Sequence, residues 1–210
     1  MGVVLTHPGA PRDSFFCGCA GVRIAAFVCH RIQDRLRQAV PRADVAGIGI
    51  AQLLQDAANA LAHLIGDPSQ LAAVAYDRNL VPDAVEESLR MEPAATLVDR
   101  YATREVDLLE ARIGVGDLVT VSLAGANRDP VVFDDPDRFD VRRPNLHLQL
   151  AFVKGPHVCL GLHLARLQTI AAVDAVLDLL PGVRLDDGFE PARGLVFRKP
   201  AAGPVTWDPV

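Results

Sequence analysis

One cysteine of the chain stands in a setting suited to chemistry. Cys159 lies between Gly155 and Gly161 in the stretch AFVKGPHVCLGLHLARLQ, just ahead of a long apolar run. Gly155 and Pro156 predict a tight turn, and the apolar run predicts a helix that begins close to the cysteine. Backbone N–H groups at the start of a helix stabilise an anionic sulfur. The stretch therefore indicates either a nucleophile or a metal ligand.

The two interpretations differ in the partners that the sulfur needs. A nucleophilic cysteine requires a base, and His157 and His163 are near in the sequence. No other His, Asn or Asp is arranged to complete a catalytic triad with them. Metal ligation by Cys159 fits the glycine-rich loop better.

A second cysteine group lies near the N-terminus. Cys17, Cys19 and Cys29, followed by His30, form an alternative zinc or cluster site. The pattern lacks the two paired spacings that are typical of such sites. Small buried thiols are the simpler interpretation of these three residues.

Length and composition limit the class of protein. The chain has 210 residues, half of them hydrophobic, and a formal net charge of −5. These values indicate a helix-rich globular protein of one domain or slightly more, and the acidic balance argues against a nucleic-acid partner. The N-terminal sequence lacks the basic and apolar regions of a signal peptide, and no apolar run has a membrane-spanning length. We therefore expect a cytoplasmic protein without a membrane partner.

The hydrophobic pattern predicts a mainly α fold with small β-sheets. Apolar residues at helical spacing and Pro or Gly stops predict helices over residues 23–40, 44–66, 68–77, 82–91 and 160–180. Short alternations of β-branched residues predict strands and hairpins over residues 95–123, and a Pro- and Asp-rich composition predicts an irregular segment over residues 126–150.

Two further features come from these elements. In the last helix, Leu160, Leu164, Leu167 and Ala171 share one stripe, which we expect to be buried. In the stretch EESLR, Glu87 and Arg90 are three residues apart and share a face of their helix. Taken alone, such a pair is most often a solvated surface ion pair.

The cysteine stretch resembles the haem loop of the cytochrome P450 family, the haem-thiolate monooxygenases, whose pattern is F-G-x-G-x-H-x-C-x-G. FVKGPHVCLG matches this pattern at five positions, and Val153 stands where the family usually has Gly. The matching residues are Phe152, Gly155, His157, Cys159 and Gly161.

Other motifs of the family follow in the expected order. Glu87 and Arg90 match its Glu-x-x-Arg pair, and Arg143 in FDVRR matches the third position of its Glu-Arg-Arg network. The resemblance implies that these three residues form a structural network that holds the loop before the cysteine. Arg100 matches a strand arginine that pairs with a haem propionate in the family, as His157 does from the cysteine loop.

The resemblance implies a fold, a cofactor and partners. Residues 41–210 would form the C-terminal, haem-binding part of the cytochrome P450 fold, and residues 1–40 remain an unassigned helical segment. Cys159 would hold the iron of haem b, and one oxygen atom of O2 would enter a small organic substrate. The chain has no nucleotide or flavin motif, so electrons would come from NAD(P)H and its reductase through a ferredoxin- or flavodoxin-type donor.

The chain departs from the family pattern in two respects. The family usually carries an acid followed by Thr for proton delivery, and here that pair falls on either Ala51-Gln52 or Asp56-Ala57. Asp56 is therefore our candidate for proton delivery, without the hydroxyl. Family members are also considerably longer, so the chain resembles the C-terminal half of such an enzyme, through truncation, gene decay or partnership with a second polypeptide. The alternatives to an active monooxygenase are a catalytically silent haem-binding fragment and a non-enzymatic partner subunit.

Overall fold

The structure is a computed structural model that describes residues 50–108, 111–198, 200 and 203–208. The expectations for residues 1–40, including the site at Cys17, Cys19 and Cys29, lie outside these residues. In the described part the fold is mainly helical with small sheets, which confirms the expected class.

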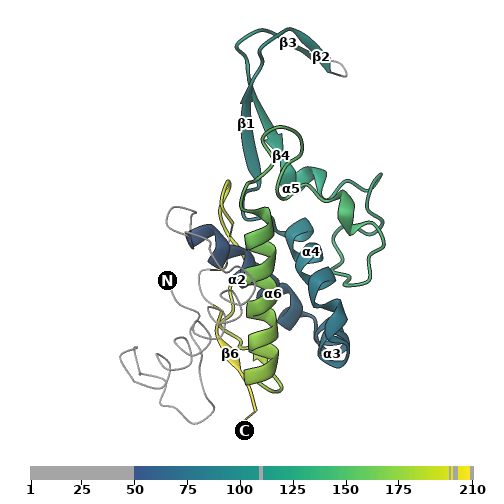
Figure 1. The fold of residues 1–210 in the computed structure, drawn as a ribbon, viewed down its shortest axis with the longest axis vertical. Coiled ribbons are helices and arrows are strands. Elements are labelled where there is room, and N and C mark those ends of the chain that lie inside the picture. Colours follow the sequence, from purple (N-terminus) through teal and green to yellow (C-terminus); the bar gives the residue numbers. More distant parts are fainter. Residues whose placement is uncertain (1–49, 109–110, 199, 201–202, 209–210) are drawn as a thin grey trace.

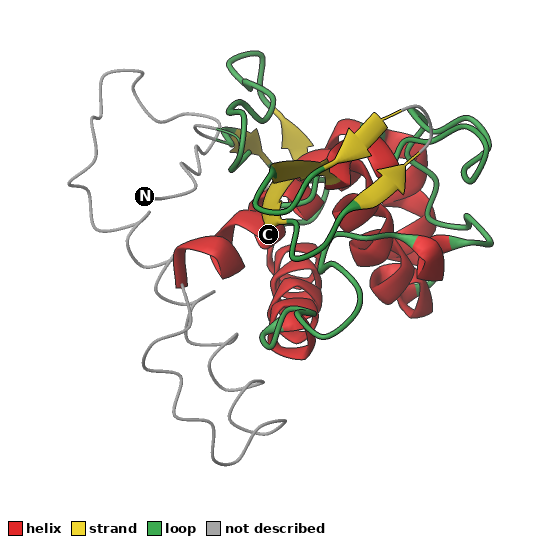
Figure 2. Cartoon of the chain, turned by 90° about the horizontal axis from the view of Figure 1, so that it is seen from above, coloured by secondary structure: helices red, strands yellow, loops and turns green. Residues whose placement is uncertain are grey.

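Three long helices lie side by side and form the centre of the molecule (Figure 1). They are α2 (Ile50–Gly66), α4 (Val81–Met91) and α6 (Leu162–Leu179). Between α2 and α4 the chain forms α3 (Pro68–Tyr76) and the short 3-10 helix η1 (Arg78–Leu80). The helices predicted for this part of the sequence are therefore confirmed, and Figure 2, seen from above, shows them gathered into one group.

Two apolar clusters hold the helices together. The larger cluster joins the facing sides of α2, α3, α4 and α6 and includes Phe139 and Val141 from the irregular segment. The smaller cluster surrounds the end of α6 and includes Trp207. It ties the two-stranded sheet of β5 (Arg184–Leu185) and β6 (Val205–Thr206) to the helices.

The buried face of α6 differs from the predicted stripe. Leu160 precedes the helix and is fully exposed, whereas Ala165, Thr169, Val173 and Val176 are buried. Small and β-branched side chains line this face because α6 packs against both α2 and α4, and close approach of helices favours small contact residues. The prediction of a leucine stripe was therefore wrong at its first residue.

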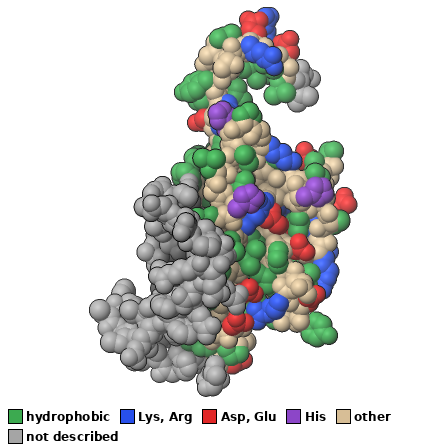
Figure 3. Space-filling view, viewed as in Figure 1, with side chains coloured by type: hydrophobic (Ala, Val, Ile, Leu, Met, Phe, Trp, Pro, Cys, Tyr) green, Lys and Arg blue, Asp and Glu red, His purple; other side chains and the backbone are tan. Residues whose placement is uncertain are grey.

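A long antiparallel hairpin extends away from the helices (Figure 1). β1 (Leu97–Tyr101) pairs with β4 (Leu118–Ser122), and β2 (Val106–Leu108) pairs with β3 (Ala111–Ile113) at the far end. Figure 3 shows both apolar and charged side chains on this projection. The hairpin returns to the helices through α5 (Leu123–Ala126).

The predicted charge network lies inside the protein. Glu87 and Arg90 on α4 have no exposed side-chain surface, and Arg143 is 6% exposed. Nε of Arg90 donates to Oε2 of Glu87 at 2.7 Å, and Nε of Arg143 donates to Oε1 of the same carboxylate at 3.1 Å. The guanidinium of Arg90 also lies 5.2 Å from the ring centroid of Phe133. One carboxylate therefore neutralises part of the charge of two arginines.

The same arginines hold the irregular segment, which includes the short 3-10 helix η2 (Leu146–Leu148). Further N–H groups of both arginines donate to backbone carbonyls, and the amide of Asp140 donates to Oε1 of Glu87 at 3.0 Å. A segment with little regular structure thus has its buried carbonyl groups satisfied by side chains. The acceptors are the carbonyls of Asn127, Pro136 and Arg138 for Arg90, and those of Asp134, Asp135 and Arg138 for Arg143.

We expect Glu87→Ala to lower the free energy of unfolding by about 3–5 kcal/mol, because it leaves two buried cations without their anion. Urea denaturation of the full chain measures this change. The control is Glu105→Ala, which removes the exposed pair of Glu105 with Arg112 and should cost at most about 1 kcal/mol. A similar small loss for Glu87→Ala would contradict the role of the network.

Candidate functional site

The cysteine loop is built from successive turns between η2 and α6. The amide of Cys159 donates to the carbonyl of Phe152 at 3.0 Å, and the amide of Val158 donates to the carbonyl of Gly155 at 3.1 Å. Gly155 has a φ of +92°, a conformation that favours glycine. Cys159 is exposed and precedes Gly161, the residue that caps the start of α6.

Val153 is a strained residue of this loop. Its φ is +62°, in the left-handed region that β-branched side chains rarely adopt. This is the position at which the family pattern has glycine. The backbone at this position therefore has a conformation that favours glycine, although the residue is a valine.

A cavity of about 180 Å³ opens beside the cysteine loop. Most of its wall is apolar, and its polar side chains are those of Asp56, His157 and Cys159. Five of the predicted site residues meet here, since Phe152 and Gly161 also line the cavity. The remaining lining residues are Leu89, Ala94, Ala95, Val98, Leu123, Ala151, Val153 and Ala165.

Asp56 reaches the cavity from α2, near the middle of that helix. Its side chain is 6% exposed, and its Oδ1 accepts no hydrogen bond from any residue that the structure describes. Burial raises the pKa of its carboxyl from 3.8 to about 7. The group therefore holds and releases a proton near neutral pH. Of the two alternative acid positions, Asp56 lies in the cavity wall, and the side chains of Ala51 and Gln52 lie outside the described part.

Two amide side chains fix this part of α2. Nε2 of Gln55 donates to the carbonyl of Arg198 at 2.8 Å, and Nδ2 of Asn59 donates to the same carbonyl at 3.0 Å. Asn59 also donates to the carbonyl of Glu92 at 3.1 Å, just after α4. These contacts set the rotation of α2 and so direct Asp56 toward the cavity.

Two of the predicted cofactor-binding residues, Gly155 and Arg100, do not line the cavity. Gly155 shapes the turn of the loop, whereas Arg100 lies on the exposed part of β1 and donates to the carbonyl of Asp99 at 2.8 Å. Alternate residues of a strand share a face, so Arg100 lies on the same face of β1 as Val98, which lines the cavity. Arg100 therefore lies on the face of β1 that borders the cavity, but farther along the strand than the residues that form the cavity wall.

An ion pair that no sequence pattern predicted lies beside the site. Glu86 on α4 and Arg166 on α6 form a salt bridge, and Arg166 also lies over the ring of Phe152. Glu86 directly precedes Glu87 in EESLR. This second acid beside the charge network is the sequence signal that could have indicated one partner of the ion pair. Its partner is 80 residues away in the chain and has no local signal.

No group of three or more His, Cys, Asp or Glu side chains that could hold a metal ion occurs among the described residues. Among the same residues, no helix has the length and apolar character needed to cross a membrane.

We expect Val153→Gly to raise the free energy of unfolding by about 1 kcal/mol. Glycine removes a left-handed strain of about 1–3 kcal/mol, and its greater freedom in the unfolded chain offsets part of the gain. Urea denaturation measures the change, and Val153→Ala is the matched variant that keeps a Cβ. A loss of stability for the glycine variant would show that packing of the valine outweighs the strain.

We expect Asp56→Asn to remove a pH dependence of folding stability in the haem-free chain. The folded state holds this proton up to about pH 7, and the unfolded chain releases it near 3.8. The contribution of Asp56 is therefore full below about pH 4 and is lost as the pH rises to about 7, by up to about 1.4 kcal/mol per pH unit. The measurement is the difference in urea stability between wild type and variant across this range. A difference that does not change with pH would contradict the buried carboxyl.

Comparison with known proteins identifies the family. The model of the cytochrome P450 family matches residues 70–179. The chain is 45% identical over 130 residues to the cytochrome P450 monooxygenase PikC of Streptomyces venezuelae, which is 61% of this chain and 31% of that protein. It is 38% identical over 154 residues to the biotin biosynthesis cytochrome P450 of Bacillus subtilis, which is 71% of this chain and 38% of that protein.

A solved structure shows the same arrangement of elements. P450BioI, in complex with an acyl carrier protein ligated to hexadec-9Z-enoic acid, superposes with a TM-score of 0.73 at 30% identity. The match covers 90% of this chain and 54% of that structure. The chain thus spans about a third of the length of these curated relatives and about half of the solved structure. It belongs to the cytochrome P450 family of monooxygenases.

Proposed function

We propose that residues 41–210 are the haem-binding part of a haem-thiolate monooxygenase, with Cys159 as the iron ligand. The observation that carries the proposal is the cavity in which Cys159, His157 and Asp56 meet, in a chain of the cytochrome P450 family. The match of the whole loop from Phe152 to Gly161 with the family pattern supports the assignment of Cys159.

The residues present suit haem b. An exposed thiol provides a ligand for iron, and the apolar wall around Ala95, Val98 and Leu123 suits the edge of a macrocycle. His157 in the cavity wall and Arg100 on the adjacent strand are the candidate partners of the haem carboxylates. Haem bound there supplies the activation of O2 and the insertion of one oxygen atom into the substrate.

Asp56 is the proposed proton donor of the site. A buried carboxyl with a pKa of about 7 is matched to proton transfer at neutral pH. Its Oδ1 has no partner among the described residues, so it is available to a water molecule or a substrate hydroxyl in the cavity. Ala57 follows it in place of a hydroxyl residue, so the transfer proceeds without a neighbouring Thr.

The proposed partners follow from the family. We expect a small organic substrate and electrons from NAD(P)H and its reductase through a ferredoxin- or flavodoxin-type donor in the cytoplasm. The chain matches 54% of a related solved structure and Cys159 is exposed, so the part of the fold that would cover the site lies outside this sequence. The same two observations favour the second candidate, a haem-binding fragment without turnover. Product formation with a surrogate ferredoxin system distinguishes an active monooxygenase from a haem-binding fragment without turnover.

We expect Cys159→Ala to abolish the thiolate-type absorption band of the reduced, carbon monoxide-treated protein. The full chain is loaded with haem, reduced and treated with carbon monoxide, and its haem content is measured in parallel. Removal of the sulfur leaves the iron without its proposed ligand.

The control replaces Cys17, Cys19 and Cys29 together by Ser. This variant should keep the band and the haem content of the wild type. Survival of the thiolate band in Cys159→Ala, or its loss in the triple variant, would move the ligand away from Cys159.

A further inference from the structure

An ion pair joins two helices on the side of the cysteine loop. Nη2 of Arg166 donates to Oε2 of Glu86 at 2.9 Å, and Nε of Arg166 donates to Oε1. The side chains of Arg166 and Glu86 are 32% and 22% exposed, so the pair is partly shielded from water. A partly buried, bidentate pair holds its geometry better than an isolated surface pair.

The pair makes two contacts with the cysteine loop. The guanidinium carbon of Arg166 lies 5.0 Å from the ring centroid of Phe152. Nε2 of Gln149 donates to Oε2 of Glu86 at 3.0 Å, and the oxygen of the same amide accepts the N–H of Ala151. Residues 149–152 are thus held through a side-chain amide and through an aromatic ring.

Phe152 connects the ion pair with Cys159. Its carbonyl accepts the amide N–H of Cys159 at 3.0 Å, which closes the loop between the two residues. The loop also contains the strained Val153 with its φ of +62°. A closed loop with a strained residue needs an external restraint, and the cation above Phe152 provides one.

We propose that Arg166, held by Glu86, is a positioning residue that fixes Phe152 and thereby the orientation of Cys159. The inference rests on the proposed function, in which Cys159 ligates the haem iron. Arg166 acts through Phe152 and does not line the cavity itself. The two adjacent acids on α4 then have different roles. Glu87 holds the irregular segment, and Glu86 holds the cysteine loop.

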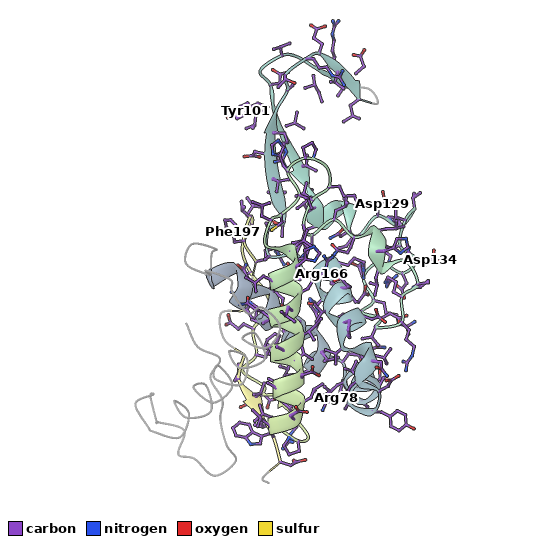
Figure 4. All side chains as sticks on the ribbon, viewed as in Figure 1. Arg78, Tyr101, Asp129, Asp134, Arg166 and Phe197 are labelled. Carbon is purple, nitrogen blue, oxygen red and sulfur yellow. The ribbon has the colours of Figure 1, made fainter. Side chains whose placement is uncertain are left out.

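A second arginine, Arg78 of η1, pairs with acids on α6 and offers a control. Arg78 lies 3.5 Å from Asp174 and 3.3 Å from Asp178, both on α6, and its side chain is 38% exposed. Figure 4 shows Arg166 and Arg78 near opposite ends of α6. Arg78→Met therefore removes an arginine that pairs with α6 without touching the cysteine loop.

The first experiment measures amide hydrogen exchange in the haem-free full chain. In Arg166→Met and Glu86→Gln we expect exchange of the Cys159 amide to rise about tenfold relative to that of Leu64 in the core, as for loss of one charged hydrogen bond. Arg166→Lys keeps a cation above Phe152 and should restore part of the protection. Arg78→Met should leave the ratio unchanged. An unchanged ratio in Arg166→Met, or an equal rise in Arg78→Met, would overturn the proposal.

The second experiment uses the haem-loaded chain. The reduced carbonyl spectrum of Arg166→Met should lose much of the thiolate-type band, and Arg78→Met should keep it. A full thiolate band in Arg166→Met would overturn the positioning role. If the wild type binds no haem, the proposed function fails, and the exchange ratio of the Cys159 amide still decides whether Arg166 holds the loop.

Discussion

The buried carboxylate of Glu87 is the constraint on which the rest of the described structure depends. Two arginines lie within hydrogen-bond distance of it, and neither Glu87 nor Arg90 has an exposed side chain. Charges removed from water to this degree are tolerated only when each donor and acceptor has a partner. The irregular segment supplies those partners as backbone carbonyls. The charges and the segment therefore depend on one another, and neither is stable in this arrangement alone.

Helix α4 connects the buried carboxylate of Glu87 with the candidate site. Successive residues of a helix are rotated by about 100°, so Glu86 and Glu87 point to different neighbours. Glu87 meets Arg143 from the irregular segment, and Glu86 meets Arg166 from α6. One turn of α4 thus positions both the irregular segment, which leads to the cysteine loop, and α6, which follows that loop.

Several residues of the candidate site have features that destabilise the folded state. Val153 has a left-handed backbone conformation, and Asp56 is a buried acid without a described partner for one oxygen. Cys159 and Leu160 are exposed beside them. Strain, unsatisfied polar atoms and exposed reactive groups concentrate where a protein binds a ligand, and the surrounding packing compensates for their cost. Here α2, α4 and α6 provide that packing.

Much of this protein was determined by local sequence. Helical periodicity with Pro and Gly stops predicted α3, α4 and α6 closely, and β-branched alternation predicted the region of the hairpin. Glu87 and Arg90 were recognised as neighbours because three residues separate them on one helix. The glycines around Cys159 marked it as a candidate ligand. Such features depend on residues close in the chain, so their signals are visible without a fold.

Contacts between distant parts of the chain decided the remaining features. No local pattern places Arg143 beside Glu87, since 56 residues separate the two, and only the resemblance to a family predicts the contact. The direction of Asp56 into the cavity depends on contacts of α2 with residues 92 and 198. The burial of Ala165 in place of Leu160 depends on how closely α6 approaches two other helices. The pair of Glu86 and Arg166 joins positions 80 residues apart. Each of these contacts follows from the packing of several elements at once, and the pattern within any one element does not specify it.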